Sequence, residues 1–382
     1  MTRAVVDVIV PAFRQHDLVR QCIESLLVAE CTTPHRIIVV DDCSSDADLS
    51  RYLAEKVEND EIELHVNPKN LGFTRTVNFA MQQHLDRDVV LLNSDTIVYP
   101  QWLDRIRFAA LSADDIATVN PMTTQYGSHI SCYPGLTTKF DGALEVTDNV
   151  IDAIARAVNA GKTRQVHATV GFCMHINRKA LDEIGYFDAT NFPVAYGEES
   201  DFCYRATKTG WRHLVAGDVF VTHLEGKSYG EKKAALMANM LARFAVLHPE
   251  AAMCDRRFER NDPLRLLRAA IDLGRVARWL EGTSTLVVVG DGDRAPAGRL
   301  PWLQFDGARS TIAIRSSEIA AGSLPNIDHF VLPAELSRFN AALDGLGIKH
   351  LSFQSERTCQ DFDKATKKTH RDEVGLAVAM VA

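Results

Sequence analysis

The sequence predicts an α/β fold with a mostly parallel sheet, followed by helices and a small C-terminal α/β unit. Four short runs rich in Val, Ile and Leu alternate with segments of helical periodicity over the first hundred residues. Strands that are apolar throughout are typical of parallel sheets covered by helices on both faces. Polar clusters follow two of these runs, and ligands of such sheets bind at the carboxyl ends of the strands.

The individual elements follow from the same periodicities. The first apolar run covers 4–10 and ends at Pro11, because proline cannot donate a hydrogen bond within a sheet. Further strands are expected at 36–40, 62–66, 89–92, 166–176 and 214–222, and helices at 17–29, 47–58, 73–85 and 199–209. Residues 120–165 show mixed patterning with several Gly, Pro and Tyr, and are expected to form an insertion over the site.

Three segments are expected along the chain: a main domain over 1–230, a helical extension over 231–282 and a small α/β domain over 283–382. The last domain is expected to contain strands at 286–289, 311–314 and 330–332 and a helix at 334–346. Its apolar end predicts that the sequence stops near a domain edge of a longer protein.

Seven arginines of the helical extension fall between residues 256 and 278. They are Arg256, Arg257, Arg260, Arg265, Arg268, Arg275 and Arg278. We expect them to form mostly a solvated face, with contact to an anionic membrane surface as the alternative.

Composition excludes several classes of protein. The 382 residues carry a formal net charge of -8, which argues against a nucleic-acid-binding surface over the whole chain. No apolar stretch approaches the roughly 18 residues of a membrane span, and the N-terminus lacks a signal peptide. The eight cysteines include no C-x-x-C pair, so a zinc ribbon is not expected. We expect a cytoplasmic location, with peripheral contact at the inner face of the membrane left open.

Acidic side chains follow two of the predicted strands. Asp41 and Asp42 follow the strand at 36–40, and Asp95 follows the strand at 89–92. Each could cap the next helix or turn, or could bind a metal ion or a polar ligand group.

A second acidic group lies at the start of the helix expected at 199–209. Glu198, Glu199 and Asp201 fall within four residues, where a helix dipole favours anions and where a general base could also lie. His223 follows the strand at 214–222 and could be structural or a ligand.

The ordered motifs resemble those of a known family. In chain order they are Val10-Pro11-Ala12-Phe13, Val39-Val40-Asp41-Asp42-Cys43-Ser44-Ser45-Asp46, Asn67-Pro68-Lys69-Asn70-Leu71-Gly72-Phe73 with Asn78, Leu91-Leu92-Asn93-Ser94-Asp95, Gly171-Phe172-Cys173-Met174, Gly197-Glu198-Glu199-Ser200-Asp201-Phe202-Cys203-Tyr204-Arg205, Gly210-Trp211 and Val221-Thr222-His223. Over roughly 4–230 the chain resembles the family 2 inverting glycosyltransferases, and within them the rhamnosyltransferase-like and O-antigen or cell-wall polysaccharide branch. The resemblance implies a GT-A fold with a Rossmann-like sheet, in which 1–230 is the catalytic domain.

The resemblance also implies a nucleotide-sugar site. The residues expected to line the nucleotide pocket or lie near the diphosphate are Pro11, Ala12, Phe13, Lys69, Asn70, Gly72 and Arg75. Asp42 would accept from the ring N–H of uracil or thymine, with Asp41 as the alternative.

Metal, base and acceptor residues are implied in the same way. Asn93, Ser94 and Asp95 occupy the position of the family's D-x-D motif, and Asp95 with His223 would bind Mg²⁺ or Mn²⁺. Glu199 would be the catalytic base, with Glu198 beside it as the other catalytic residue. Residues expected on the acceptor side are Phe172, Asp201 and Trp211.

Two departures from the family pattern stand out. Asn93 and Ser94 leave a single carboxylate in the D-x-D position, so part of the metal coordination is expected from the donor diphosphate. Glu199 replaces the Asp of the usual Glu-Asp pair, which moves the base by about one methylene.

The expected reaction is transfer of a sugar from a UDP- or dTDP-sugar to a hydroxyl of a glycan, a lipid-linked molecule or a protein. One alternative is a sugar-nucleotide nucleotidyltransferase, but the glycine-rich loop of that class is missing after the first strand. The other alternative is a non-catalytic nucleotide-sugar or carbohydrate-binding module. The lone Gly290-Asp291-Gly292 is not expected to bind a dinucleotide.

Overall fold

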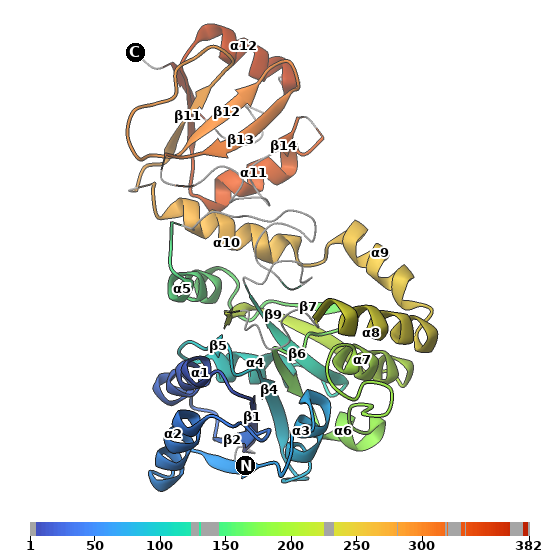
Figure 1. The fold of residues 1–382 in the computed structure, drawn as a ribbon. Coiled ribbons are helices and arrows are strands. Elements are labelled where there is room, and N and C mark those ends of the chain that lie inside the picture. The colour runs from blue at the N-terminus through green and yellow to red at the C-terminus, as the bar shows by residue number, and fades with distance from the viewer. Residues whose placement is uncertain are drawn as a thin grey trace. The chain divides into compact units, whose positions relative to one another are not determined.

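A computed structural model describes residues 5–123, 130, 145–224, 233–280, 282–317, 319, 330–332, 334–366 and 377–380. The chain divides into two compact units. The first comprises 1–125 and 160–264, and the second comprises 126–159 and 265–382. Figure 1 shows the elements of both units.

The first unit is built on an eight-stranded, largely parallel sheet, which confirms the predicted fold class. Its strands follow the order β3-β2-β1-β4-β8-β6-β9-β7. They are β1 Val6–Ala12, β2 His35–Asp41, β3 Glu63–Val66, β4 Asp88–Leu92, β6 Ile116–Met122, β7 Thr163–Val166, β8 Cys173–Ile176 and β9 Arg212–Phe220. β8 and β7 run antiparallel to their neighbours, and the other pairs are parallel.

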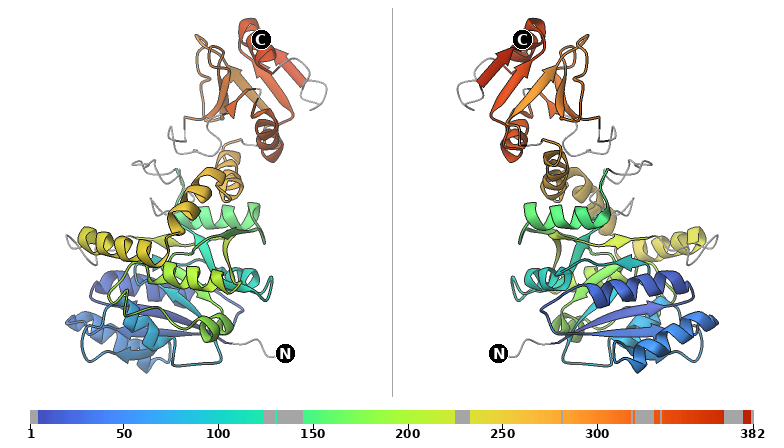
Figure 2. Two further views of the ribbon diagram at one scale, coloured as in Figure 1. Left: turned by 90° about the vertical axis from the view of Figure 1, so that its right-hand side faces the viewer. Right: turned by 90° about the vertical axis from the view of Figure 1, so that its left-hand side faces the viewer.

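Helices cover both faces of this sheet. They are α1 His16–Val28, α2 Ala47–Glu58, α3 Phe73–Ala80, α4 Trp102–Ala110, α6 Arg178–Ile184, α7 Glu198–Lys208, α8 Lys233–Leu247 and α9 Ala251–Asn261. α1 and α2 lie on one face, and α3, α6 and α7 lie on the other (Figures 1 and 2). The strands are apolar throughout because side chains on both of their faces are buried, as in β4, where Val89 to Leu92 have no exposed surface.

A two-stranded ribbon lies beyond the sheet. β5 (Thr96–Ile97) pairs antiparallel with β10 (Thr222–His223), and His223 lies opposite Thr96. The ribbon joins the segment after β4 to the segment after β9. These are two of the places where the sequence carries candidate site residues.

The second unit contains a six-stranded sheet in the order β14-β13-β12-β11-β15-β16. Its strands are β11 Thr285–Val289, β12 Trp302–Asp306, β13 Thr311–Arg315, β14 Phe330–Val331, β15 His350–Phe353 and β16 Ala377–Met380. Its helices are α5 Asp148–Val158, α10 Arg265–Ala277, α11 Leu336–Gly345 and α12 Glu356–Ala365. The small α/β unit expected near the C-terminus is therefore present, and β12 is a strand that the sequence pattern did not predict.

The two units divide the helices as follows. α8 and α9, expected in a separate extension, belong to the first unit, and 126–159 belongs to the second. Within the second unit α5 packs closely on α10, where a Cβ at Gly274 would lie 2.4 Å from Cγ2 of Ile154. Of the insertion expected at 120–165, residues 124–129 and 131–144 lie outside the described residues.

The expectation of a solvated arginine face holds for only part of the set. Arg275 has no exposed surface, and its guanidinium contacts both carboxylate oxygens of Glu145 at 2.8 Å and Oδ1 of Asp272 at 3.1 Å. Arg268 is also buried. The prediction was wrong for these two; for Arg275 the reason is that a paired, hydrogen-bonded arginine can lie in a helix interface.

Helix α3 ends five residues before its expected end. After Ala80, the side-chain amides of Gln82 and Gln83 donate to the carbonyls of Asn78 and Phe79, each at 2.8 Å. These bonds satisfy carbonyls that a longer helix would pair with backbone N–H groups. Among the described residues, no helix has the length and apolar character that crossing a membrane requires.

Candidate functional site

The predicted nucleotide residues lie at the carboxyl ends of β1 and β2. Pro11 and Ala12 close β1, and Phe13 follows with the guanidinium of Arg14 stacked 5.0 Å from its ring centroid. The backbone N–H of Arg14 donates to Oγ of Ser44 at 2.8 Å. This bond joins the loop after β1 to the loop after β2, so the two predicted nucleotide-binding loops are adjacent.

Asp42 holds the loop that precedes α3. Its Oδ1 accepts from Nδ2 of Asn67 and from the N–H of Leu71, both at 2.8 Å, and its Oδ2 accepts from the N–H of Gly72 at 2.9 Å. An ionised carboxylate offers about four acceptor positions, so roughly one position is left for a ligand N–H. Asp41, the alternative, is buried and accepts from the N–H of Ser44 at 2.9 Å.

The same loop packs against the segment that precedes α7. Gly72 has φ +79°, and a Cβ there would lie 3.2 Å from the carbonyl oxygen of Pro193 and from Cα of Val194. The guanidinium of Arg75 donates to the carbonyls of Pro193 and Ala189 at 3.3 and 3.4 Å. Loop 67–72 and segment 189–194 are therefore held together, although more than a hundred residues separate them.

Asp95 and His223 form the centre of the site. Oδ1 of Asp95 lies 3.2 Å from Nε2 of His223, and both side chains are largely buried. The ring of Phe172 stacks on the imidazole with centroids 5.3 Å apart. The N–H of Leu224 also donates to the carbonyl of Asp95 at 2.8 Å, so the pair has a fixed geometry across the β5–β10 ribbon.

The Asp95–His223 pair is a suitable but incomplete metal site. A carboxylate oxygen and an imidazole nitrogen are both ligands that first-row cations such as Mn²⁺ accept. Within the part of the chain that the structure describes, no group of three or more His, Cys, Asp or Glu could hold an ion. The backbone N–H of Asn93 donates to the carbonyl of Phe172 at 2.8 Å. Ser94 lies in the turn between β4 and β5. Among the described residues this pair would thus supply two ligands, and a bound phosphate would have to supply others.

Glu198 and Glu199 occupy the first turn of α7. Burial raises the pKa of Glu199, although backbone N–H groups that include those of Gly197 and Gly171 partly offset this. Burial, and then the charge of Glu199, raise the pKa of Glu198 well above its usual range. Oε2 of Glu198 is buried without a hydrogen-bond partner. Two adjacent carboxyls that resist ionisation are an arrangement suited to proton transfer.

The turn before α7 has a backbone conformation that is rare for a bulky residue. Tyr196 has φ +70° and Gly197 has φ +98°, so two consecutive residues are left-handed. Burial raises the pKa of Tyr196, and the charges of Glu198, Glu199 and Asp95 add to this effect. The charges of Asp95 and of the two glutamates of α7 therefore act on the same phenol. A Cβ at Gly171 would lie 3.8 Å from Glu199, and the ring of the next residue, Phe172, stacks on His223, so both pairs border the same segment. Strained backbone of this kind concentrates at functional sites.

Asn120 is a site residue that the sequence reading missed. Its side chain is fully buried, and its Oδ1 accepts from the N–H of Val170 at 2.6 Å. Its Nδ2 donates to the carbonyls of Val170 and Cys173. These bonds fix the backbone on both sides of Phe172 and next to Gly171, where a Cβ would lie 3.8 Å from Glu199. No motif marks Asn120, because its partners lie about fifty residues away.

Two predicted acceptor residues lie elsewhere. Asp201 is buried, with its carboxylate 2.7 Å from Nε of Arg205 and 2.8 Å from Nε2 of His248. Trp211 follows the far end of α7, and its indole N–H donates to Glu183 at 3.1 Å. Both side chains therefore contact other residues of the fold and not the Asp95–His223 pair, whereas the ring of Phe172 stacks on His223.

Comparison with known proteins gives a family match. Residues 3–243 match the family described as "Glycosyltransferase like family 2". No curated protein matches the chain.

Several solved structures are similar to the chain at low sequence identity. GalNAc-T7 with UDP, GalNAc and Mn²⁺ is 16% identical with a TM-score of 0.46, over 58% of this chain and 44% of that one, so the chain spans less than half of it. The mannosyltransferase PcManGT from Pyrobaculum calidifontis, in complex with GDP-Man and Mn²⁺, is 15% identical with a TM-score of 0.47, over 74% of this chain and 77% of that one. S. aureus TarS 1-349 is 15% identical with a TM-score of 0.41, over 72% of this chain and 81% of that one.

Proposed function

The chain belongs to the glycosyltransferase-like family 2, and from this premise we propose that it transfers a sugar from a UDP- or dTDP-sugar to an acceptor hydroxyl with inversion. The observation that supports this most is Glu199, a partly buried glutamate at the start of α7 whose pKa is raised by desolvation. A Cβ at Gly171 would lie 3.8 Å from Glu199, and the adjacent Phe172 stacks on His223, which supports placing Glu199 in one site with the Asp95–His223 pair.

The proposed reaction is a direct displacement. Glu199 takes the proton of the acceptor hydroxyl, and the oxygen attacks the anomeric carbon from the face opposite the nucleotide. The bond from that carbon to the diphosphate oxygen breaks, and the nucleoside diphosphate leaves. A raised pKa makes Glu199 a stronger base than an exposed glutamate, which favours this proton transfer.

The leaving diphosphate carries negative charge that must be offset. A divalent cation, when bound, would do this as a Lewis acid. Asp95 and His223 would hold it, and we propose Mn²⁺ over Mg²⁺ because imidazole is a better ligand for the softer ion. Phe172 fixes the orientation of the His223 ring by stacking.

Nucleotide binding is assigned to the edge formed by β1 and β2. Pro11, Ala12 and Phe13 would line the pocket, and the base N–H would use the remaining acceptor position of Asp42, or Asp41. The bonds from Asp42 to Leu71 and Gly72 would then couple base recognition to the loop beside Asn70 and Arg75. The rhamnosyltransferase-like or cell-wall branch, with a glycan, lipid-linked or protein acceptor, is part of this proposal and rests on motif order.

The test is the Glu199→Gln variant, with Glu55→Gln, at an exposed glutamate of α2, as its matched control. A thermal-shift screen of UDP- and dTDP-sugars with Mn²⁺ first identifies a donor. Release of nucleoside diphosphate from that donor should then fall at least about 100-fold in Glu199→Gln, while donor binding is retained. Unchanged turnover would remove Glu199 from the role. Donor binding without metal-dependent release, in the unmodified chain, would favour a binding module instead.

A further inference from the structure

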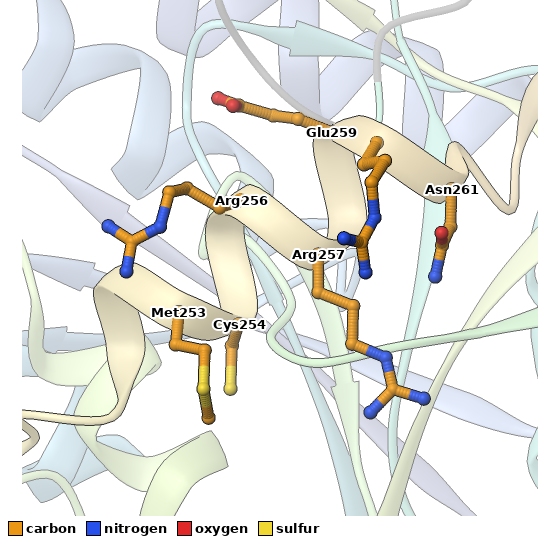
Figure 3. Close-up of a pocket in the computed structure, with 7 residues that line it drawn as sticks. Met253, Cys254, Arg256, Arg257, Glu259 and Asn261 are labelled. Carbon is orange, nitrogen blue, oxygen red and sulfur yellow. The ribbon is translucent and has the colours of Figure 1, made fainter.

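One stripe of α9 carries three arginines and a methionine. Met253, Arg256, Arg257 and Arg260 follow the spacing i, i+3, i+4 and i+7, which places them on one face of the helix. All four are exposed, Met253 to 62%. They line a hollow of about 970 Å³ along the helix, whose lining residues are drawn in Figure 3.

The opposite stripe of α9 is anchored in the first unit. Ala251 and Phe258 are buried, and the ring of Phe258 lies 5.2 Å from that of His167. His167 also contacts Oδ1 of Asp255 at 2.8 Å. The arginine stripe therefore faces away from the protein that α9 packs against.

Helix α8, which precedes α9 in the chain, also carries exposed apolar side chains. Leu241 is 63% exposed and Val246 is 81% exposed, while Phe244 packs on Tyr204 of α7 with ring centroids 5.5 Å apart. Residues 233–247 contain no Asp or Glu. Large apolar side chains beside basic residues are the composition of helices that lie in a membrane interface.

The acids near this surface are mostly neutralised. Residues 233–261 contain five Lys or Arg and three Asp or Glu, in a chain whose net charge is -8. Glu250 pairs with Lys208 at 3.0 Å, and Asp255 pairs with His167. Glu259 is the remaining acid of the three, so positive charge is concentrated on this surface.

We propose that α8 and α9, through Leu241, Val246, Met253 and the three arginines of α9, bind the surface of a bilayer that contains anionic phospholipids. The guanidiniums would contact lipid phosphates, and the apolar side chains would enter the headgroup region. A second copy of the chain fits less well, because a symmetric contact would bring the two arginine stripes together. This binding does not depend on sugar transfer, so it can fail or hold without affecting the proposed function.

The test is sedimentation of the full chain with vesicles. Vesicles of phosphatidylcholine with phosphatidylglycerol should carry the chain down, and pure phosphatidylcholine vesicles should not. Binding should weaken as salt is raised, because the attraction is screened within a Debye length. Changing Arg256, Arg257 and Arg260 together to Gln should weaken binding to anionic vesicles roughly 100-fold, since each basic residue near such a surface contributes about a factor of five.

Matched controls separate this surface from general charge and hydrophobicity. Changing the exposed residues Arg51, Arg294 and Arg309 to Gln removes the same charge elsewhere and should leave binding unchanged. Leu241→Ser with Val246→Ser should also weaken binding, whereas Val28→Ser with Leu111→Ser should not. Equal binding to neutral vesicles, or retained binding in the α9 variant, would overturn the proposal. The proposal would also be overturned if the chain did not bind vesicles and instead self-associated through Leu241 and Val246.

Discussion

Asp95 and His223 face each other across the β5–β10 ribbon, with Oδ1 of the aspartate 3.2 Å from Nε2 of the histidine. The two residues are 128 positions apart in the chain, and the pairing of His223 with Thr96 brings them together. Burial of both side chains leaves a carboxylate and an imidazole with little competing water. Such a pair can close on a cation together with oxygens from a bound phosphate.

His223→Gln should therefore raise the Mn²⁺ concentration that gives half-maximal activity by about tenfold or more, because one of two protein ligands is lost. The measurement is nucleoside diphosphate release in EDTA-treated protein that is titrated with Mn²⁺. His65→Gln is the control, since His65 forms a surface contact with Glu63 at 2.9 Å. The same metal requirement in His223→Gln and the unmodified chain would rule out His223 as a ligand.

Glu198→Gln should stabilise the protein at neutral and alkaline pH. The folded state raises the pKa of Glu198, so folding becomes less favourable as pH rises from about 4.5 upward, where the unfolded glutamate ionises freely. Glutamine removes this charge and keeps the shape. We expect a gain of at least about 1 kcal/mol, or roughly 2–4 °C in Tm, at pH 8.

The pH profile is the readout for Glu198. The difference in Tm between Glu198→Gln and the unmodified chain should shrink as pH falls toward 4.5, where both carry a neutral group at this position. A lower Tm for the variant at pH 8 would contradict the claim that the buried carboxyl opposes folding. Glu24 is a half-exposed glutamate whose pKa is lowered in the folded protein. The control variant Glu24→Gln should therefore lower the Tm at pH 8, whereas Glu198→Gln raises it.

The parallel strands of the first unit were predictable from sequence because strands buried on both faces are continuous apolar runs, as in β2 and β4. Asp95 and Glu199 were predicted as site residues because each lies in a motif beside such an element. Asp42 was predicted too, but its bonds to Leu71 and Gly72 were not, since no local pattern connects positions about thirty residues apart.

Other features could not be predicted for the same reason. Asn120 holds the backbone around Phe172 through partners about fifty residues away. Asp201 was expected near the acceptor because it lies next to Glu199 in sequence. On a helix, however, a shift of two residues turns the side chain by about 200°, toward Arg205 and His248.

Asp42→Asn should loosen the loop before α3. Asparagine has one acceptor oxygen where Asp42 uses two, so one of the N–H groups of Leu71 and Gly72 loses its partner. We expect a loss of about 1–3 kcal/mol in the free energy of unfolding, with a raised KM for the donor and a smaller change in kcat. Denaturant unfolding and donor-dependent kinetics measure the two effects.

The control for Asp42 is its neighbour. Asp41→Asn retains an Oδ1 that can accept from the N–H of Ser44, so its stability should change less. Equal losses in the two variants would show that the bonds to Leu71 and Gly72 contribute nothing particular.

His213 should make the protein less stable in mild acid. Its ring is buried, with Nδ1 2.7 Å from Oγ1 of Thr118 and Nε2 3.0 Å from the carbonyl of Cys203. Nε2 donates to that carbonyl, and the hydroxyl donates to Nδ1, so the neutral ring is satisfied. Burial lowers the pKa of His213 to about 4, and the nearby charge of His167 contributes.

The sign follows from proton uptake. The unfolded histidine gains a proton below about pH 6.5, whereas the folded one stays neutral until about pH 4, so stability falls over this range by about 3 kcal/mol. The Glu198–Glu199 pair acts in the opposite sense over part of the same range. The readout is therefore the difference in slope of unfolding free energy against pH between the unmodified chain and His213→Gln. A shallower slope from pH 7 to 5 in His213→Gln is expected, and identical slopes would mean that His213 gains its proton over the same pH range in the folded and unfolded chains.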